Sequence, residues 1–164
     1  LEEVTFRRAT IPVTDIMAYA GKYFKRISRG VDYKITLTIE PLEAKVIGDI
    51  NQLRFLIENL IDEALSFHQD GELVLKAIMD DSADSFLFTD RRREKQVEEL
   101  NQLFYPNLAR MTSGEKGELR GTEYLICKQI IRDHDEFAGR RGCRINAEPA
   151  QGGGFTVFFT VPKR

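Results

Sequence analysis

The amino-acid sequence predicts an α+β fold, a two-layer sandwich in which a mixed sheet of about five strands carries helices on one face. Segments with strand periodicity and segments with helical periodicity are interleaved along the chain, in the order β-α-β-β-α-β-β-α-loop-α-β-β. Adjacent strands joined by short turns are typical of antiparallel hairpins. The length of 164 residues suits one domain over 1–164.

The first elements are short strands around one helix. Residues 5–8 are predicted as a strand, and apolar residues then recur at helical spacing over 16–27 until Gly30 ends the segment. Residues 33–39 alternate strictly between apolar and polar side chains, which indicates a half-buried strand. Residues 44–47 form a further short strand.

The clearest helix begins at Asp49, whose side chain can cap the first backbone donors. Gln52 stands three residues later and is predicted to complete a capping box. One continuous apolar stripe then follows at helical spacing: Leu53, Leu56, Ile57, Leu60, Ile61, Ala64 and Leu65.

The second half begins with a hairpin of two strands, 72–79 and 85–89. Residues 94–104 are predicted as a helix. The polar stretch 105–120 is predicted as a long loop, and loops of that length in a domain are usually lids or binding loops.

The last elements are a helix over 123–132 and two strands, 143–147 and 155–161. Gly152, Gly153 and Gly154 form the turn between these strands.

Composition narrows the classes of function. Net charge is −2, with 42% hydrophobic and 30% charged residues, so charge gives no argument for a nucleic-acid partner or an anionic membrane. No apolar run approaches the roughly 20 residues of a membrane span. Cys127 and Cys143 fit no metal or disulfide spacing, which favours a reducing compartment. Because the chain starts at Leu1 without a signal peptide, we expect a fragment of a longer protein.

Six motifs occur in order along these elements. They are Gly48-Asp49 with Leu53, Asn59-Leu-Ile-Asp-Glu63-Ala64, Asp90-Arg-Arg-Arg-Glu94, Leu103-Phe-Tyr-Pro-Asn107, Leu119-Arg-Gly121-Thr-Glu123 with its following helix, and Gly152-Gly-Gly-Phe-Thr-Val-Phe-Phe-Thr-Val-Pro162.

Together the motifs resemble the boxes of the histidine-kinase-type ATPase domain, the fold shared with gyrase, Hsp90 and MutL. The resemblance covers Phe6 to Pro162. It implies the catalytic, ATP-binding domain of a two-component sensor histidine kinase, a phosphotransferase that uses Mg-ATP. It also implies a preceding helical dimerisation and phospho-acceptor region, a response regulator as partner, and a homodimer in full length. The domain would be cytoplasmic, and its parent protein can be anchored in a membrane.

The resemblance also implies which residues hold the nucleotide. Asn59 and Glu63 correspond to the magnesium-holding N box, and Asp90 to the aspartate that accepts a hydrogen bond from adenine. Gly121 and Thr122 lie in the phosphate-binding G2 box.

Several positions depart from the family pattern. Arg92 and Glu94 replace the two G1 glycines, while Leu119 and Glu123 replace two G2 glycines, and backbone there must come close to the ligand. Glu63 replaces an asparagine. A carboxylate can ligate magnesium. Beside a polyphosphate, however, one unit-charge pair at 4 Å costs about 4 kcal/mol at an effective dielectric near 20.

Two hypotheses follow from these departures. In the first, which we favour, the domain is a sensor-kinase catalytic domain with weakened or lost binding of Mg-ATP, so that its cofactor is Mg-ATP or none. In the second, it is a catalytically inactive docking or dimer-regulating module in a signalling protein.

The candidate residues also have simpler explanations. Asp90 can cap a strand end, Asn59 and Glu63 can form a solvated polar edge of a helix, and 91–93 can be a solvated cluster instead of a phosphate site. Neither His68 nor His134 stands in a phospho-acceptor context. His134 matches a family histidine near a helix end and is predicted to terminate that helix.

Overall fold

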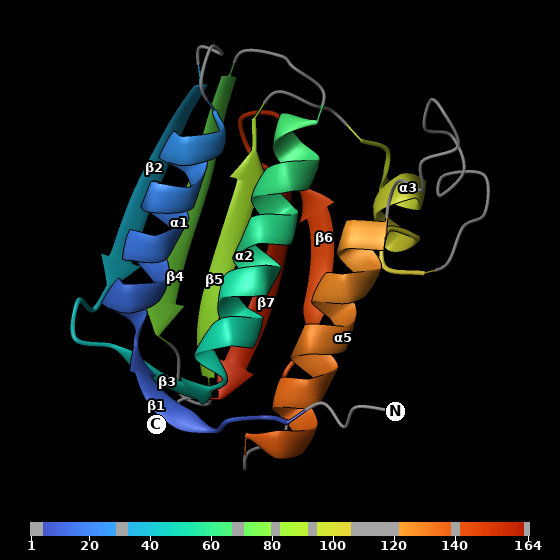
Figure 1. The fold of residues 1–164 in the computed structure, drawn as a ribbon. Coiled ribbons are helices and arrows are strands. Elements are labelled where there is room, and N and C mark those ends of the chain that lie inside the picture. Colours follow the sequence, from blue (N-terminus) through green and yellow to red (C-terminus); the bar gives the residue numbers. More distant parts are fainter. Residues whose placement is uncertain are drawn as a thin grey trace.

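The structure is a computed structural model, and it describes residues 5–28, 33–66, 71–79, 83–91, 95–105, 122–138 and 142–162. Five strands form one sheet in the order β2-β4-β5-β7-β6 (Figure 1). Their bounds are β2 Tyr33–Glu40, β4 Gly71–Met79, β5 Ala83–Asp90, β6 Ile145–Pro149 and β7 Phe155–Pro162. β2 pairs with β4 in parallel and every other pair in this sheet is antiparallel, which confirms the predicted mixed sheet.

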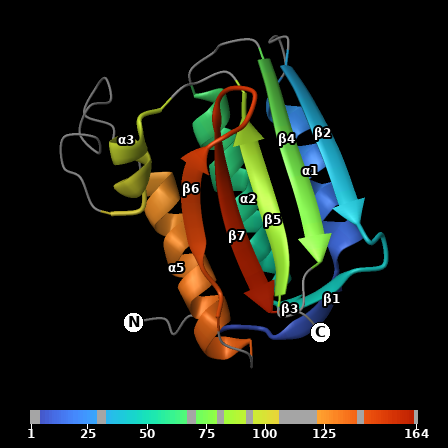
Figure 2. The same cartoon turned by 180° about the vertical axis from the view of Figure 1, so that it is seen from behind.

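Three long helices cover one face of the sheet: α1 Val13–Ile27, α2 Ile50–Leu65 and α5 Thr122–Phe137 (Figure 1). The view from behind shows the strands in front of the helices, with no described element over the strands (Figure 2). The strand side chains that face the helices are almost fully buried, among them Leu73, Leu75, Phe86, Val157 and Phe159. The predicted two-layer α+β sandwich is therefore confirmed. None of the described helices is both long and apolar enough to cross a membrane.

The first strand lies later than predicted. β1 spans Ala9–Pro12 and pairs antiparallel with β3, Lys45–Gly48. Residues 5–8 form no strand. They are instead tied down through side chains, because the N–H of Arg7 donates to Oδ2 of Asp49 (2.9 Å) and Nε of Arg8 donates to the carbonyl of Ala138 (3.0 Å). We call residues 5–8 the N-terminal arm.

The N-cap of α2 was predicted correctly, but the capping box was not. Oδ1 of Asp49 accepts from the N–H groups of Asn51 and Gln52. The return bond from Gln52 does not form, because the N–H of Asp49 donates to Nε2 of His134 instead. Oε1 of Gln52 is buried and accepts no hydrogen bond from the described residues.

Two helices differ in length from the prediction. α3 spans only Val97–Asn101, not 94–104, since Gln96 caps it and the chain tightens into a turn from Gln102 onward. α5 extends five residues beyond the predicted end at 132. His134 does not terminate it: the side chain is fully buried inside the fold.

The end of the chain follows the prediction closely. β6 begins two residues later than predicted, because the carboxylate of Asp135 accepts from the N–H groups of Gly142 and Cys143 and holds them in a loop. The glycine turn is confirmed, with positive φ at Gly152 and Gly154. The predicted long loop falls almost entirely outside the described residues.

Candidate functional site

The predicted site residues that the structure describes lie at one end of the sandwich. α2, which carries Asn59 and Glu63, and β5, which closes at Asp90, both finish at this end, whereas α5 begins there with Thr122 (Figure 1). Gly121 lies outside the described residues, as do Arg92, Glu94 and Leu119. We call this end of the molecule the site end.

Asn59 is a buried residue of α2, with 6% of its surface exposed. Its Nδ2 donates to the carbonyl oxygen of Phe55 one turn earlier, across 2.7 Å. This bond fixes the orientation of the amide, so the side-chain oxygen is the group that could ligate a cation. Asn59 is therefore not part of a solvated polar edge.

Glu63 lies one turn beyond Asn59 and is half-buried. Its backbone carbonyl accepts from both the N–H and the hydroxyl of Ser66, which closes the helix. Its carboxylate lies towards α5. Burial raises the pKa of the Cys127 thiol on α5, and the negative charges of Glu123 and Glu63 raise it further.

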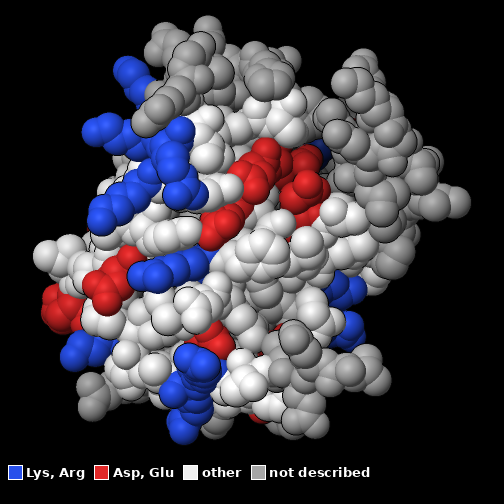
Figure 3. Space-filling model, in the orientation of Figure 1, with Lys and Arg blue, Asp and Glu red and all other residues white. Residues whose placement is uncertain are grey.

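Four carboxylates lie along the second half of α2 and in the first turn of α5, and we call Glu58, Asp62, Glu63 and Glu123 the acidic cluster. Burial raises the pKa of Asp62, and the charges of Glu58 and Glu123 raise it further, against the hydrogen bond from Tyr23. Figure 3 shows acidic side chains gathered over the upper part of α2 and the start of α5. The candidate site thus has a strongly negative wall.

Two tyrosines of α1 position part of the acidic cluster. The hydroxyl of Tyr19 donates to Glu58 (2.6 Å) and that of Tyr23 donates to Asp62 (2.6 Å). The bond to Glu58 raises the pKa of Tyr19, and burial followed by the bond to Asp62 raises that of Tyr23. Sequence reasoning missed this pairing. The local signal is limited to the spacing of four between the two tyrosines of α1 and between the two carboxylates of α2. That spacing does not say which helices face each other.

Asp90 is the last residue of β5 and is 1% exposed. It alternates with Phe86 and Phe88, which are buried beneath the helices, so its side chain lies on the helix-covered face. A buried carboxylate at this position can accept a hydrogen bond from a ligand amino group.

Arg91 supports the end of β5 from outside. Its guanidinium donates to the carbonyl of Gln151 (2.5 Å) and to that of Gly153 (3.3 Å), while its N–H donates to Glu72. This arginine of the predicted cluster is therefore engaged with the turn between β6 and β7. Arg92 and Arg93 lie outside the described residues.

The described residues suit the adenine and the magnesium ion of Mg-ATP but not its phosphates. Asp90 suits an adenine amino group, and the oxygens of Asn59 and Glu63 suit a hard cation. The acidic cluster, however, opposes a polyphosphate by like-charge repulsion. In the described part of the chain, no three His, Cys, Asp or Glu side chains are grouped as a metal site.

Comparisons with known proteins add a family and a fold. The family model described as "Histidine kinase-, DNA gyrase B-, and HSP90-like ATPase" matches residues 48–164. The nucleotide-free catalytic domain of histidine kinase ThkA is similar with a TM-score of 0.76 and 17% identity, covering 96% of this chain and 98% of that one. Mycobacterial sensor histidine kinase MprB gives 0.70 and 18%, covering 98% and 99%.

ThkA in complex with response regulator protein TrrA is similar with a TM-score of 0.72 and 16% identity, covering 99% of this chain and 44% of that one. At these identities the likeness shows the fold. A search of curated proteins found no match.

Proposed function

The chain belongs to the family of histidine kinase-, DNA gyrase B- and HSP90-like ATPases, and from this premise we propose that it is the catalytic-type domain of a two-component sensor histidine kinase with weakened or lost ATP binding. The observation that carries the proposal is the acidic cluster, three of whose carboxylates lie on α2, the helix that carries Asn59. In this proposal Asp90 and Asn59 act as ligands of the adenine and the cation, and the carboxylates of the acidic cluster repel the phosphates.

The expected loss of affinity for ATP is large. A single carboxylate about 4 Å from a phosphate charge costs about 4 kcal/mol at an effective dielectric near 20. That energy corresponds to roughly a thousandfold in affinity. A bound magnesium ion would offset part of it, so the affinity of this site depends on the cation more steeply than that of a neutral site.

The parent protein follows from the same proposal. It would hold a preceding helical dimerisation and phospho-acceptor region, act as a homodimer, and signal to a response regulator. The fold similarity to ThkA, which has been seen with response regulator TrrA, supports this partner. The domain would lie in the cytoplasm, and its parent protein can be anchored in a membrane. No nucleic acid is expected as a partner.

The second candidate is an inactive docking or dimer-regulating module. It is favoured by the sequence positions at which Arg92, Glu94 and Leu119 replace glycines of the nucleotide-binding boxes. In that case the fold is retained and nucleotide turnover is lost.

One titration separates a kinase domain with weakened ATP binding from a docking module that binds no nucleotide. A fluorescent ATP analogue with magnesium is titrated into the wild type and Asp90→Asn, and thermal unfolding is followed in parallel, because a ligand of the native state raises the melting temperature. Binding that Asp90→Asn removes supports the kinase domain with weakened binding. No binding and no thermal shift at millimolar Mg-ATP leaves the docking module.

A further inference from the structure

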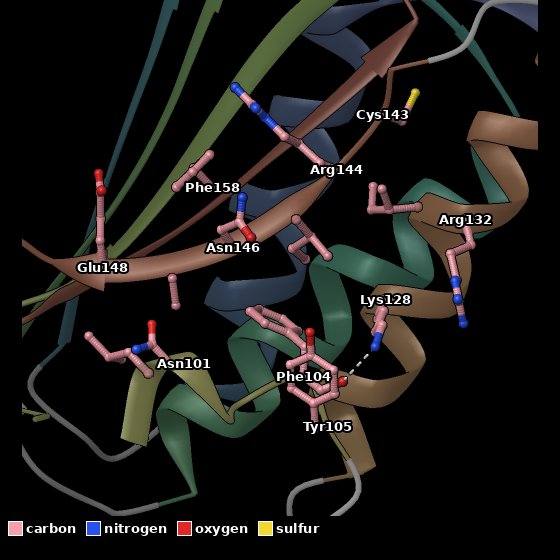
Figure 4. Close-up of a pocket in the computed structure, with 14 residues that line it drawn as sticks. Asn101, Phe104, Tyr105, Lys128, Arg132, Cys143, Arg144, Asn146, Glu148 and Phe158 are labelled. Carbon is pink, nitrogen blue, oxygen red and sulfur yellow. Dashed lines mark hydrogen bonds between the residues drawn. The ribbon is translucent and has the colours of Figure 1, made fainter. Parts of the chain in front are cut away.

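The edge strand β6 lies beside a cavity of about 660 Å³, which is bounded by α3 and α5 on its other sides (Figure 4). Residues 143–148 all line this cavity, although their side chains alternate between the two faces of the sheet. A space that contacts side chains of both faces must pass along the edge of the strand. The cavity therefore runs along the open edge of β6, and α3 packs near the strand on one side of it.

The backbone of β6 has hydrogen-bonding groups along this edge to which no described residue bonds. β6 pairs with β7 alone among the described strands. The carbonyl of Arg144 accepts from the N–H of Thr160, so the alternation of an antiparallel pair turns the groups of Ile145 and Ala147 away from β7. No described residue bonds to those outward groups. Pro149, which has no N–H, stands at another outward position, as an edge strand allows.

The open edge is short and has defined ends. At one end the N–H of Cys143 is bonded to the carboxylate of Asp135 (2.9 Å), and at the other Pro149 offers no donor. Ile145 and Ala147 between them present two donors and two acceptors in the spacing of a β-ladder. Another extended backbone matches this pattern, and such strand addition is a common mode of peptide recognition.

The helix side of the cavity combines an apolar floor with an aromatic wall. Leu100, Phe104 and Ile131 line it and are buried, whereas the ring of Tyr105 is 58% exposed. Nζ of Lys128 lies 4.2 Å from the centre of that ring and donates to the carbonyl of Phe104 (3.2 Å). An apolar side chain of a bound strand would find contacts here.

Cations flank the edge on both faces. Lys128 and Arg132 project from α5 on the helix side, and Arg144 points to the other side of β6 (Figure 4). Glu148 is the only carboxylate among the lining residues, against these three cations. The guanidinium groups of Arg132 and Arg144 form no ion pair with a described residue. A strand with acidic side chains would therefore meet positive charge on either face.

From the unpaired backbone groups and the flanking cations, we infer that the open edge of β6 binds an extended acidic peptide segment of a partner protein as a sixth strand. Ile145 and Ala147 pair with its backbone, and Arg132 and Arg144 with its carboxylates. This site lies on the far side of α5 from the acidic cluster and goes beyond the proposed nucleotide function.

The test uses a defined probe, the peptide Glu-Val-Glu-Phe-Glu-Val-Glu-amide with fluorescein on its N-terminal amine, and follows its fluorescence anisotropy with the 164-residue chain. The expected result is saturable binding below 1 mM, at least tenfold tighter than that of the same peptide with Lys in place of Glu. Equal binding of the two peptides, or no binding at 1 mM, overturns the inference.

Ala147→Pro is the decisive variant, because it removes one outward N–H and leaves the ladder with β7 intact. Its melting temperature reports that the fold survives, and Ala147→Val is the control for side-chain size. We expect Ala147→Pro to weaken the acidic peptide at least tenfold and Ala147→Val by less than threefold. Unchanged binding to a folded Ala147→Pro overturns backbone pairing.

Three further measurements test the contribution of charge and that of strand addition. Arg132→Glu should weaken the peptide at least fivefold, whereas Lys25→Glu, on the exposed face of α1, should not. Amide exchange of Ile145 and Ala147 should slow when the peptide binds. A peptide N-methylated at alternate residues that binds as tightly as the parent overturns the inference in favour of a charged surface.

Discussion

The backbone N–H of Asp49 donates a hydrogen bond to Nε2 of His134, 3.1 Å away and 85 residues later in the chain. Because Nε2 accepts, the ring proton lies on Nδ1, which is 2.8 Å from the carbonyl of Ile130. Phe6 packs edge-on against the same imidazole. One neutral side chain of α5 thus joins the N-cap of α2 to the N-terminal arm.

This geometry predicts that acid destabilises the fold through His134. Burial lowers the pKa of His134 below its ordinary value of 6.5. The unfolded chain therefore binds the proton more readily, so the stabilisation is complete above pH 6.5 and is lost as pH falls from there through the folded pKa. Urea unfolding between pH 7.5 and 5.5 should show a slope that approaches 1.4 kcal/mol per pH unit for one proton.

The slope should be smaller in His134→Gln and unchanged in His68→Gln. Asp62, whose raised pKa acts in the opposite direction, is common to all three proteins and cancels in the comparison. Equal slopes in wild type and His134→Gln would contradict the assignment.

Gly48→Ala should destabilise the domain by about 1–3 kcal/mol through overpacking. A Cβ at Gly48 would lie 2.6 Å from Nε2 of His134, and Gly48 does not need a positive φ. The clash should therefore be specific to the imidazole. In a double-mutant cycle of urea unfolding, Gly48→Ala should cost at least 1 kcal/mol less in the His134→Ala background. If Gly48→Ala costs the same free energy of unfolding in both backgrounds, the strain does not come from contact with His134.

Gly154→Ala should be far more damaging than Gly152→Ala. Both glycines have positive φ, which costs an alanine about 1–2 kcal/mol. A Cβ at Gly154 would also overlap the backbone carbonyl of Asp90 at 1.9 Å, whereas at Gly152 it would meet only the flexible guanidinium of Arg91 at 3.3 Å. We expect a difference of about 2 kcal/mol or more in thermal or urea unfolding. Similar losses would mean that the turn can move away from β5.

The Thr89 and Thr156 pair offers a test of buried hydrogen bonding. Their hydroxyl oxygens are 2.8 Å apart on neighbouring strands, and each residue is 7% exposed. Replacing either one by valine should cost about 1–3 kcal/mol, because the remaining hydroxyl loses its partner. Replacing both should cost less than the sum of the two single changes. Chemical denaturation of the four proteins gives this coupling energy, and a coupling near zero would indicate that water replaces the bond.

Glu63→Asn should raise affinity for Mg-ATP if the acidic cluster weakens the site. The substitution removes one negative charge beside Asn59, and at an effective dielectric near 20 the gain can reach about 4 kcal/mol at 4 Å. Glu99→Gln on α3 removes the same charge at an exposed position away from the cluster and is the matched control. Titration with the fluorescent ATP analogue should show tightening in the first variant alone. Equal tightening of ATP binding in both variants would mean that Glu63 acts only through the net charge of the domain.

The sequence predicted those parts of the fold that depend on neighbours along the chain. The apolar stripe of α2, the alternation of β2 and the Asp49 cap are local patterns, and each is present in the structure. The capping box failed because His134, 85 residues away, takes the N–H that Gln52 needed. A competitor so far away along the chain cannot be recognised from the residues around Asp49.

For the candidate site, the sequence indicated which elements carry the proposed ligands but not which side chains surround them. Family motifs placed Asn59, Glu63 and Asp90 on elements that end together. The sequence did not indicate Glu58 and Asp62. Their surroundings depend on the charge of Glu123 on α5 and on hydrogen bonds from the tyrosines of α1. Opposing positions on different helices are fixed by packing, which motif spacing does not encode.

The N-terminal arm lies far from the site end. Arg7 is bonded to Asp49, at the opposite end of α2 from Glu63. Fourteen residues separate Asp49 from Glu63, and at 1.5 Å per residue they span about 21 Å. A phosphorylatable side chain attached just ahead of the arm would have to cross that length, or about six extended residues, to meet a nucleotide. Access to the site end thus requires a tether of at least that length, a rotation of the whole domain, or a second subunit.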